Sequence, residues 1–229
     1  MIVKPWERLP DELRTDQVKP YYQKLRRKSG ALAGKRLFDL AVSLLLTVLL
    51  SPVLLALAVA VKADSPGPVF FRQERVTQYG RTFRIFKFRT MVDGADKMGA
   101  SVTTHNDSRV TRVGHFLRRY RLDELPQVLN VLAGQMSFVG VRPEVPRYVE
   151  RYTPEMRATL LLPAGVTSMT SIRYKDEERL LEQAENADET YVQEILPQKM
   201  VYNLEYIRQY SFWGDIKVLF ETVKAMLGS

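Results

Sequence analysis

The sequence LFDLAVSLLLTVLLSPVLLALAVAV, from Leu37 to Val61, decides the fold, because it is strongly apolar and its only charged residue is Asp39. At about 1.5 Å per residue, a helix of this length extends roughly 37 Å, which exceeds the ~30 Å hydrocarbon core of a bilayer. The run is too long and too apolar for an ordinary core helix. The run is not a cleavable signal peptide, because 36 residues precede it and no small-residue cleavage site follows it. We therefore expect this segment to attach the chain to a membrane.

Ser51-Pro52 lies inside the run and leaves two membrane arrangements open. Proline removes one helical hydrogen bond and disfavours helix at the residue before it. The segment is either a single kinked spanning helix or a re-entrant helix–break–helix, in which the Ser51 hydroxyl serves backbone groups freed at Pro52. An excess of Lys and Arg marks cytoplasmic flanks. Both flanks are basic, which favours re-entry: Lys24, Arg26, Arg27, Lys28, Lys35 and Arg36 precede the run, and Lys62, Arg72, Arg75, Arg81, Arg84, Lys87 and Arg89 follow it.

The overall composition is that of a folded protein with a polyanionic partner. The 229 residues are 45% hydrophobic and 26% charged, which indicates one globular domain and excludes wholesale disorder. The chain has no Cys and two His, so a metal would be a hard cation held by oxygen atoms. A net charge of +8 predicts binding to nucleic acid, anionic lipid or a phosphate-bearing substrate.

The pattern predicts a mainly α fold with a small β element, organised in three parts. Residues 1–33 form a polar extension, which is either a segment with a basic end at the lipid headgroups or a poorly ordered tail. Residues 34–62 form the membrane hairpin, and residues 63–229 form a compact cytosolic globular domain. Aromatic and β-branched residues predict a short β-hairpin over residues 69–92. Apolar spacing predicts helices within residues 109–134 and 200–227, and an acidic, solvated helix over residues 176–194.

Two adjacent carboxylates, Asp123 and Glu124, follow Arg118, Arg119 and Arg121 in the sequence RRYRLDELPQ. Adjacent acids at a helix start commonly complement the helix dipole, but these lie in a domain rich in arginine. Arg binds phosphate oxygens as a planar fork, and a carboxylate among such groups is expected to have a low pKa and stay ionised. One carboxylate can then attack phosphorus to give an acyl phosphate. Its neighbour can handle a proton or hold Mg²⁺ on the phosphate oxygens.

Five motifs follow one another along the chain: Lys35-Arg36-x-x-Asp39, Ser51-Pro52, Phe86-Lys87-Phe88-Arg89-Thr90-Met91, Leu122-Asp123-Glu124-Leu125-Pro126-Gln127, and Met136-Ser137-Phe138-Val139-Gly140-x-Arg142-Pro143. In this order they resemble the motifs of the monotopic phosphoglycosyl transferases, the bacterial sugar transferases that begin glycoconjugate assembly. The resemblance extends from about Lys35 to the C-terminus. By its length, the chain looks like the small form that contains the catalytic core alone, with an N-terminal extension.

The resemblance implies transfer of a sugar-1-phosphate from a UDP-sugar to a polyprenyl phosphate such as undecaprenyl phosphate, with release of UMP. It implies that Asp123 is the nucleophile that carries the phosphosugar covalently, that Glu124 is its partner, and that both hold Mg²⁺. It also implies substrate contacts from residues in or near the matching motifs: Lys87, Arg89, Thr90, Arg118, Arg142 and Pro143, with weaker matches at Arg173 and Asp215.

Two segments depart from the family's pattern. Val141 stands where the family often has the first proline of Pro-Arg-Pro, so the backbone before Arg142 is less constrained. The family's segment PGITGWAQVNG is replaced by PAGVTSMTSIRY, from Pro163 to Tyr174, which leaves the sugar preference open.

The same resemblance implies a monotopic protein on the cytosolic face of the bacterial inner membrane. Its expected partners are the UDP-sugar, the polyprenyl phosphate, membrane lipids and a second copy of the chain, with no nucleic acid. The sequence is also compatible with two other functions. A membrane-tethered scaffold whose basic surface binds polyanions would be indifferent to Asp123→Asn. A lipid-phosphate phosphatase would hydrolyse an acyl phosphate with water and transfer nothing to lipid.

Overall fold

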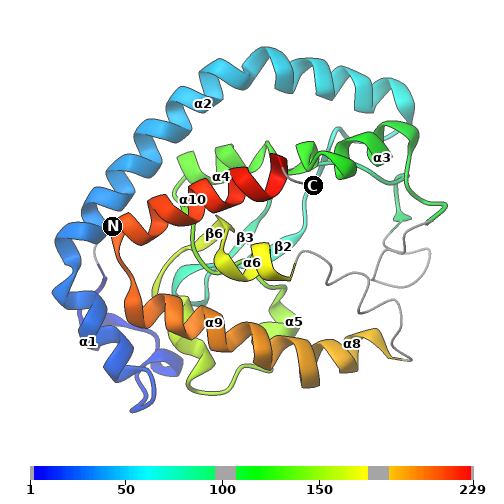
Figure 1. Cartoon of the computed structure of the whole chain (residues 1–229). Helices are drawn as coiled ribbons and strands as arrows, with labels where there is room; N and C mark the ends of the chain where they lie inside the picture. The colour runs from blue at the N-terminus through cyan, green and yellow to red at the C-terminus, as the bar shows by residue number, and fades with distance from the viewer. Residues whose placement is uncertain (1–2, 96–106, 175–185, 228–229) are drawn as a thin grey trace.

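The computed structural model describes residues 3–95, 107–174 and 186–227, and its longest element is the helix α2 (Ser29–Asp64). Helix α2 follows an arc along one side of the molecule, so that both of its ends meet the same body (Figure 1). In the part of the chain that is described, it is the one helix long and apolar enough to cross a membrane.

The expected break at Ser51-Pro52 is wrong, because α2 continues through Pro52 as one helix of 36 residues. Proline has no N–H to donate to the carbonyl of Val48, one helical turn earlier. The Ser51 hydroxyl donates to that carbonyl instead, at 2.8 Å. The role expected for the Ser51 hydroxyl is therefore confirmed, and it explains how the helix tolerates the proline without being interrupted.

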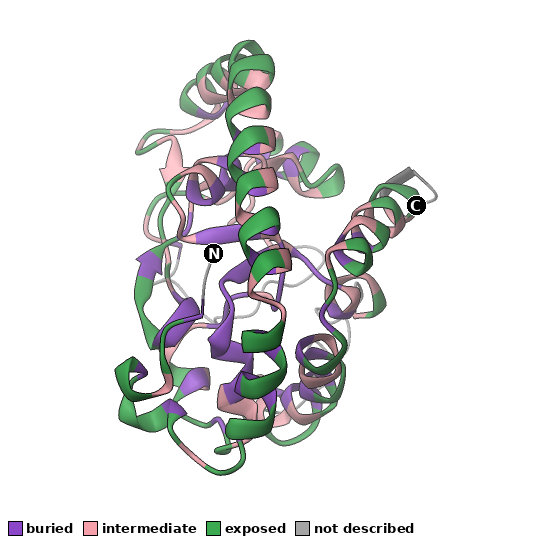
Figure 2. Cartoon of the chain, turned by 90° about the vertical axis from the view of Figure 1, so that its left-hand side faces the viewer, coloured by how far each residue is buried: buried purple, intermediate pink, exposed green. Residues whose placement is uncertain are grey.

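Polar contacts fix both ends of α2 to the body. Near its start, the Arg36 guanidinium donates to the carbonyl of Val131 at 2.8 Å. At its end, the Asp64 carboxylate accepts a hydrogen bond from the Val113 N–H at 2.9 Å. No side chain of residues 44–60 is buried, so the apolar middle of α2 contributes little to the protein core (Figure 2).

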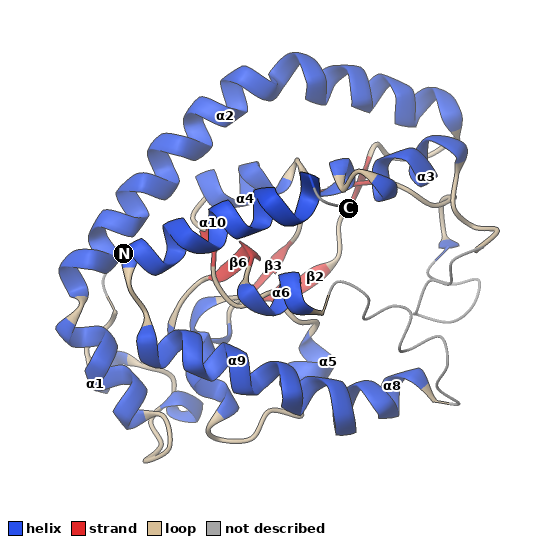
Figure 3. Ribbon diagram, in the orientation of Figure 1, coloured by secondary structure: helices blue, strands red, loops and turns tan. Residues whose placement is uncertain are grey.

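Two antiparallel strand pairs follow α2 (Figure 3). Strand β1 (Phe70–Phe71) pairs with β4 (Lys87–Phe88), and strand β2 (Glu74–Val76) pairs with β3 (Thr82–Arg84). These pairs confirm the hairpin predicted over residues 69–92. They place Lys87 on β4, where its Nζ contacts Glu124.

A third pair, formed by β5 (Met136–Val139) and β6 (Ala164–Thr167), is parallel and was not predicted. The sequence gives little sign of this pair, because the strands are short and Pro163 precedes the second one. Just beyond β5, the backbone at Gly140 approaches the backbone of β6 at Gly165 very closely. A Cβ atom on Gly165 would lie 2.2 Å from the backbone nitrogen of Gly140, so only glycine fits there.

Helices make up most of the remaining body, as predicted. The pairs of helices expected within residues 109–134 and 200–227 are both present, and the acidic helix expected over residues 176–194 lies partly outside the described residues. In chain order, the helical elements after β4 are α3 (Arg112–Arg119), the 3-10 turn η5 (Leu122–Glu124), α4 (Gln127–Leu132), α5 (Pro146–Val149), the 3-10 helix η6 (Met156–Leu161), α6 (Met169–Arg173), α8 (Ala187–Thr190), the π-helical turn η7 (Tyr191–Ile195), α9 (Leu196–Gln209) and α10 (Phe212–Leu227).

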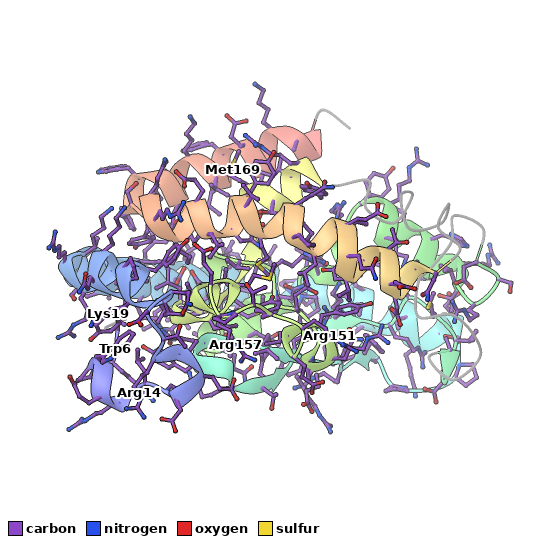
Figure 4. All side chains as sticks on the ribbon, turned by 90° about the horizontal axis from the view of Figure 1, so that it is seen from below. Trp6, Arg14, Lys19, Arg151, Arg157 and Met169 are labelled. Carbon is purple, nitrogen blue, oxygen red and sulfur yellow. The ribbon has the colours of Figure 1, made fainter. Side chains whose placement is uncertain are left out.

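The segment before α2 belongs to the main core and is not a loose tail. Two 3-10 turns, η1 (Trp6–Arg8) and η2 (Asp11–Leu13), lead into helix α1 (Lys19–Arg27). Glu12 forms an ion pair with Arg157 of η6, on the side of the molecule where Figure 4 labels Trp6, Arg14 and Arg157. The buried apolar side chains of this segment, which pack with η6 and α9, are Val3, Leu9, Leu13, Val18, Tyr21, Tyr22 and Leu25.

Candidate active site

Asp123 and Glu124 lie in η5, which the chain reaches through a left-handed turn after α3. Arg121 has φ 53°, a conformation that costs a non-glycine residue on the order of 1 kcal/mol and recurs at functional sites. The Glu124 N–H then donates to the Arg121 carbonyl at 3.4 Å, which closes the turn. The sequence thus forms a short turn with two consecutive carboxylates, beside β4 and the loop that follows β5.

Two cations bind the Glu124 carboxylate. Lys87 Nζ from β4 and Arg142 Nη2 from the loop after β5 each lie 2.7 Å from Glu124 Oε1. Burial alone would raise the pKa of the Glu124 carboxyl, but Arg142 and Lys87 outweigh burial and hold this pKa well below its usual value. The expectation of an ionised carboxylate is therefore confirmed for Glu124.

Asp123 lies in different surroundings. Burial raises the pKa of its carboxyl above the usual value, Lys87 and Arg118 oppose this effect, and the negative charge of Glu124 adds to it. The low pKa expected for a carboxylate among arginines is wrong for Asp123, because desolvation exceeds the attraction of the nearby cations. No side chain in the described ranges donates a hydrogen bond to this carboxyl.

Other predicted residues gather around the two carboxylates. Arg118, on α3, donates from Nε to the Thr90 hydroxyl at 3.2 Å. Arg118 is also close enough to Asp123 to affect its pKa. Pro143 is buried directly after Arg142. The structure therefore brings together Lys87, Thr90, Arg118, Asp123, Glu124, Arg142 and Pro143.

Three predicted substrate residues have contacts elsewhere in the fold. The buried Arg89 guanidinium donates to the carbonyls of Ser65 (2.7 Å) and Pro66 (2.8 Å), where it closes the end of α2. Arg173 lies over the ring of Tyr202, 4.5 Å from its centroid. The third residue is Asp215.

Asp215 belongs to a buried cluster at the start of α2. Its carboxylate accepts a hydrogen bond from Lys35 Nζ at 2.5 Å and another from the Tyr206 hydroxyl at 2.9 Å. Lys35 also donates to the Val139 carbonyl at 2.8 Å. These contacts connect α2, β5, α9 and α10, so Asp215 holds the body together at this point and has no contact with Glu124 in the described structure.

Arg75 belongs to the site, although in the sequence it is only one of many basic residues after the apolar run. Its Nη1 donates to the Pro143 carbonyl at 3.0 Å, and burial lowers its pKa. The sequence offers no signal for this contact, because the acceptor is a backbone carbonyl 68 residues away.

The two carboxylates have the chemistry that Mg²⁺ requires, with phosphate oxygens as further ligands. No cluster of three or more His, Asp or Glu side chains that could hold a metal occurs in residues 3–95, 107–174 and 186–227. Mg²⁺ is typically bound by one or two carboxylates, with substrate phosphates and water completing its six ligands. Asp123, which accepts no hydrogen bond from a described side chain, and Glu124 beside it fit that mode of binding.

The chain is similar to known bacterial proteins. The family model described as bacterial sugar transferase matches residues 30–229. The UDP-glucose:undecaprenyl-phosphate glucose-1-phosphate transferase of Escherichia coli is 40% identical over 193 residues, which cover 82% of this chain and 39% of that protein. The UDP-N-acetylgalactosamine-undecaprenyl-phosphate N-acetylgalactosaminephosphotransferase of Aeromonas hydrophila is 36% identical over 196 residues, which cover 84% of this chain and 43% of that protein.

A third relative is covered more fully. The UDP-glucose:undecaprenyl-phosphate glucose-1-phosphate transferase of Caulobacter vibrioides is 38% identical over 196 residues, which cover 84% of this chain and 69% of that protein. By contrast, the chain spans about two fifths of the length of the E. coli and A. hydrophila proteins. The similarity begins at the start of α2 and includes both carboxylates.

Proposed function

The chain belongs to the bacterial sugar transferase family, and on this premise we propose that it is a phosphoglycosyl transferase that uses a UDP-sugar and undecaprenyl phosphate. The relatives compared above are named for glucose and for N-acetylgalactosamine, at 40% and 36% identity. The proposal therefore extends to UDP-sugars as a class.

The contrast between Asp123 and Glu124 carries this proposal. Glu124 Oε1 already accepts hydrogen bonds from Lys87 and Arg142, so this oxygen has two cationic partners. Asp123 accepts no hydrogen bond from a described side chain and lies beside the same cations. Of the two carboxylates, Asp123 is therefore the one that attacks the phosphorus of the substrate. Arg118 and Arg142 bind the phosphate oxygens of that substrate.

The proposed reaction has two displacement steps at one phosphorus atom. An oxygen of the Asp123 carboxylate attacks the phosphorus that bears the sugar, an O–P bond forms, and the bond from that phosphorus to the bridging diphosphate oxygen breaks. UMP leaves with the bridging oxygen and its electron pair. A phosphate oxygen of undecaprenyl phosphate then attacks the same phosphorus, which breaks the acyl phosphate and restores the carboxylate.

The cations of the site favour both steps. Negative charge accumulates on the phosphate oxygens in each displacement, and preorganised cations stabilise that charge without reorganising. Mg²⁺ bound by Asp123 and Glu124 would neutralise the diphosphate further and favour the ionised form of Asp123.

We also propose that α2 enters and leaves the membrane from the cytosolic side. A helix that spanned a bilayer would place its two ends on opposite sides, but both ends of α2 contact the same body through Arg36 and Asp64. The apolar middle of α2 has no buried side chain, as expected for a lipid-facing helix. A re-entrant α2 satisfies both observations.

Further exposed apolar side chains support contact with lipid. Trp213, Phe220 and Val223 on α10 are 78%, 74% and 56% exposed. Phe116 on α3 and Tyr120, the residue that follows α3, are 52% and 51% exposed. Such residues on surface helices suit the interface between headgroups and acyl chains. Membrane lipid is thus the proposed partner for these helices.

The proposal is tested with the purified chain in vesicles that contain undecaprenyl phosphate, Mg²⁺ and one of a panel of UDP-sugars. We expect one or more UDP-sugars to release UMP and to transfer labelled sugar to the lipid fraction. Free sugar phosphate without labelled lipid would support hydrolysis instead. No UMP from any UDP-sugar would contradict the proposal.

The Asp123→Asn variant is the matched test of the nucleophile. Because Asn keeps the shape of the side chain and removes the attacking oxygen anion, we expect turnover to be abolished while folding and membrane attachment are retained. Without acceptor lipid, intact-protein mass spectrometry should detect a phosphosugar adduct on the wild type and none on the variant. Turnover comparable with that of the wild type would contradict the assignment of Asp123.

A further inference from the structure

A buried cluster of three polar side chains, Glu144, Tyr191 and Lys199, lies behind the loop that carries Arg142. The Tyr191 hydroxyl donates to Glu144 Oε1 at 2.5 Å. Lys199 Nζ donates to the Tyr191 hydroxyl at 2.9 Å and to the same Glu144 oxygen at 3.3 Å. The three residues are only 8%, 4% and 5% exposed, and none of them takes part in the chemistry proposed above.

An irregular helical turn makes this cluster possible. Tyr191 begins the π-helical turn η7, and Lys199 follows eight residues later in α9. At 3.6 residues per turn, side chains eight residues apart in a regular α-helix differ by about 80° in direction. The wider π turn takes in one extra residue, which brings the separation to roughly two full turns. Tyr191 and Lys199 therefore share one face, and both contact Glu144.

The loop behind which the cluster lies is also tied to β2. The Val76 N–H donates to the Glu144 carbonyl at 2.9 Å, and Arg75 Nη1 donates to the Pro143 carbonyl at 3.0 Å. The loop is therefore held by β2 through its backbone and by the cluster through the Glu144 side chain. Arg142 lies two residues before Glu144, and its Nη2 donates to Glu124 Oε1 at 2.7 Å.

We propose that Glu144, Tyr191 and Lys199 position Arg142, an inference that rests on the proposed function of Arg142 as a phosphate-binding residue. A proline would fix φ at position 141, but this chain has Val141 there, so the loop must be fixed by other contacts. A buried ion pair adds little net stability compared with apolar packing, whereas it can specify one geometry. Here the ion pair of Lys199 and Glu144 fixes the backbone conformation of the loop from which Arg142 contacts Glu124.

Tyr191→Phe removes one hydroxyl from the cluster and keeps the aromatic ring. We expect kcat/KM for the UDP-sugar to fall about tenfold, the size of one lost buried hydrogen bond. Tyr148→Phe is the matched control, because the Tyr148 ring packs on Tyr191 at 4.4 Å while its hydroxyl binds the exposed Asp188. The control should retain the wild-type kcat/KM. Equal losses in both variants would overturn the proposal.

A double-mutant cycle tests whether the cluster acts through Arg142. In an Arg142→Ala background, Tyr191→Phe should change kcat/KM by less than about twofold, because the residue being positioned is already absent. Glu144→Gln, which keeps an acceptor oxygen for Tyr191, should retain more activity than Glu144→Ala. If Tyr191→Phe lowered kcat/KM by the same factor with and without Arg142→Ala, its role would be generally structural and the proposal would be overturned.

Amide hydrogen exchange separates this inference from the proposed function. Residues 140–145 should exchange faster in Tyr191→Phe than in the wild type and in Tyr148→Phe, because the loop has lost one of its fixed contacts. This measurement requires no turnover. If the wild type released no UMP, the proposed function would fail and the exchange rates alone would decide the positioning role. Unchanged exchange in Tyr191→Phe would overturn the inference even in an active enzyme.

Discussion

Asp123 and Glu124 are adjacent in the chain, yet the fold treats their carboxyl groups differently. Lys87 and Arg142 hold the pKa of Glu124 well below its usual value, whereas burial raises the pKa of Asp123. Neighbouring acids whose pKa values are pushed apart by their surroundings can take different chemical roles. Glu124 is suited to organising the cations of the site, and Asp123 to reacting.

Arg142→Lys tests whether the guanidinium fork is required. Lysine keeps the charge but replaces two parallel donors by a single point charge. We expect a loss of about 1–3 kcal/mol of transition-state stabilisation in kcat/KM, typical of a hydrogen bond to a charged group. Arg147→Lys is the control, since Arg147 pairs with Asp188 at an exposed site. Wild-type kcat/KM in Arg142→Lys would exclude a direct phosphate contact.

The sequence could predict the charged centre of the site but not the partner of every charged residue. Asp123 and Glu124 stand out because two acids lie among many arginines within one short motif. In the sequence, Arg89 and Asp215 look like substrate-binding residues, as Lys87 and Arg142 do. In the structure, Arg89 directly follows β4 and binds the backbone at the end of α2. The partner of Asp215, Lys35, is 180 residues away, and no local pattern reports such a pair.

Among the elements, the parallel pair of β5 and β6 places the Arg142 loop. Both strands have four residues, which is too short for alternation of apolar and polar residues to be recognised. The continuity of α2 was also missed, because a Ser-Pro step inside an apolar run usually indicates an interruption. The hydroxyl of Ser51 replaces the missing hydrogen bond, so in this helix the proline is tolerated.

Gly165→Ala tests the close approach of these strands. A methyl group at residue 165 would lie 2.2 Å from Gly140 N, so backbone must move. We expect the free energy of unfolding to fall by about 1–3 kcal/mol, as for an overpacked core, and kcat/KM to fall with it. Gly34→Ala on α2 is the control, because its Cβ meets no atom within 4 Å. Chemical denaturation gives both values, and equal stability of the two variants would contradict the packing argument.

At the scale of the molecule, the N-terminal segment and the C-terminal helices share one core. Leu25 of α1 is 0% exposed in that core, whereas Leu37 of α2 is 70% exposed. Leu25→Ala should therefore lower the free energy of unfolding by about 2–5 kcal/mol, and Leu37→Ala should be nearly neutral in detergent. Thermal unfolding monitored by circular dichroism compares the two. Equal effects would mean that residues 3–28 are not integral to the fold.

Cysteine labelling tests on which side of the membrane the body lies. The wild type has no cysteine, and Glu7 and Glu150 are exposed positions before and after α2. Glu7→Cys and Glu150→Cys should both be protected from an impermeant thiol reagent in intact cells and should react once the cells are opened. Protection of the two sites is expected because the body is proposed to be cytosolic. Labelling of Glu150→Cys in intact cells would contradict that proposal.

The arc of α2 has a consequence for the bilayer itself. If both ends return to one surface, as proposed, the helix displaces lipid from a single leaflet and leaves the opposite leaflet unchanged. Such an inclusion is a wedge, and a wedge is accommodated more easily where the cytosolic leaflet is convex and its headgroups are spread apart. The protein should then bind small vesicles more tightly than large ones of the same composition, which sedimentation would measure. Its own shape would thus select the regions of membrane where it accumulates.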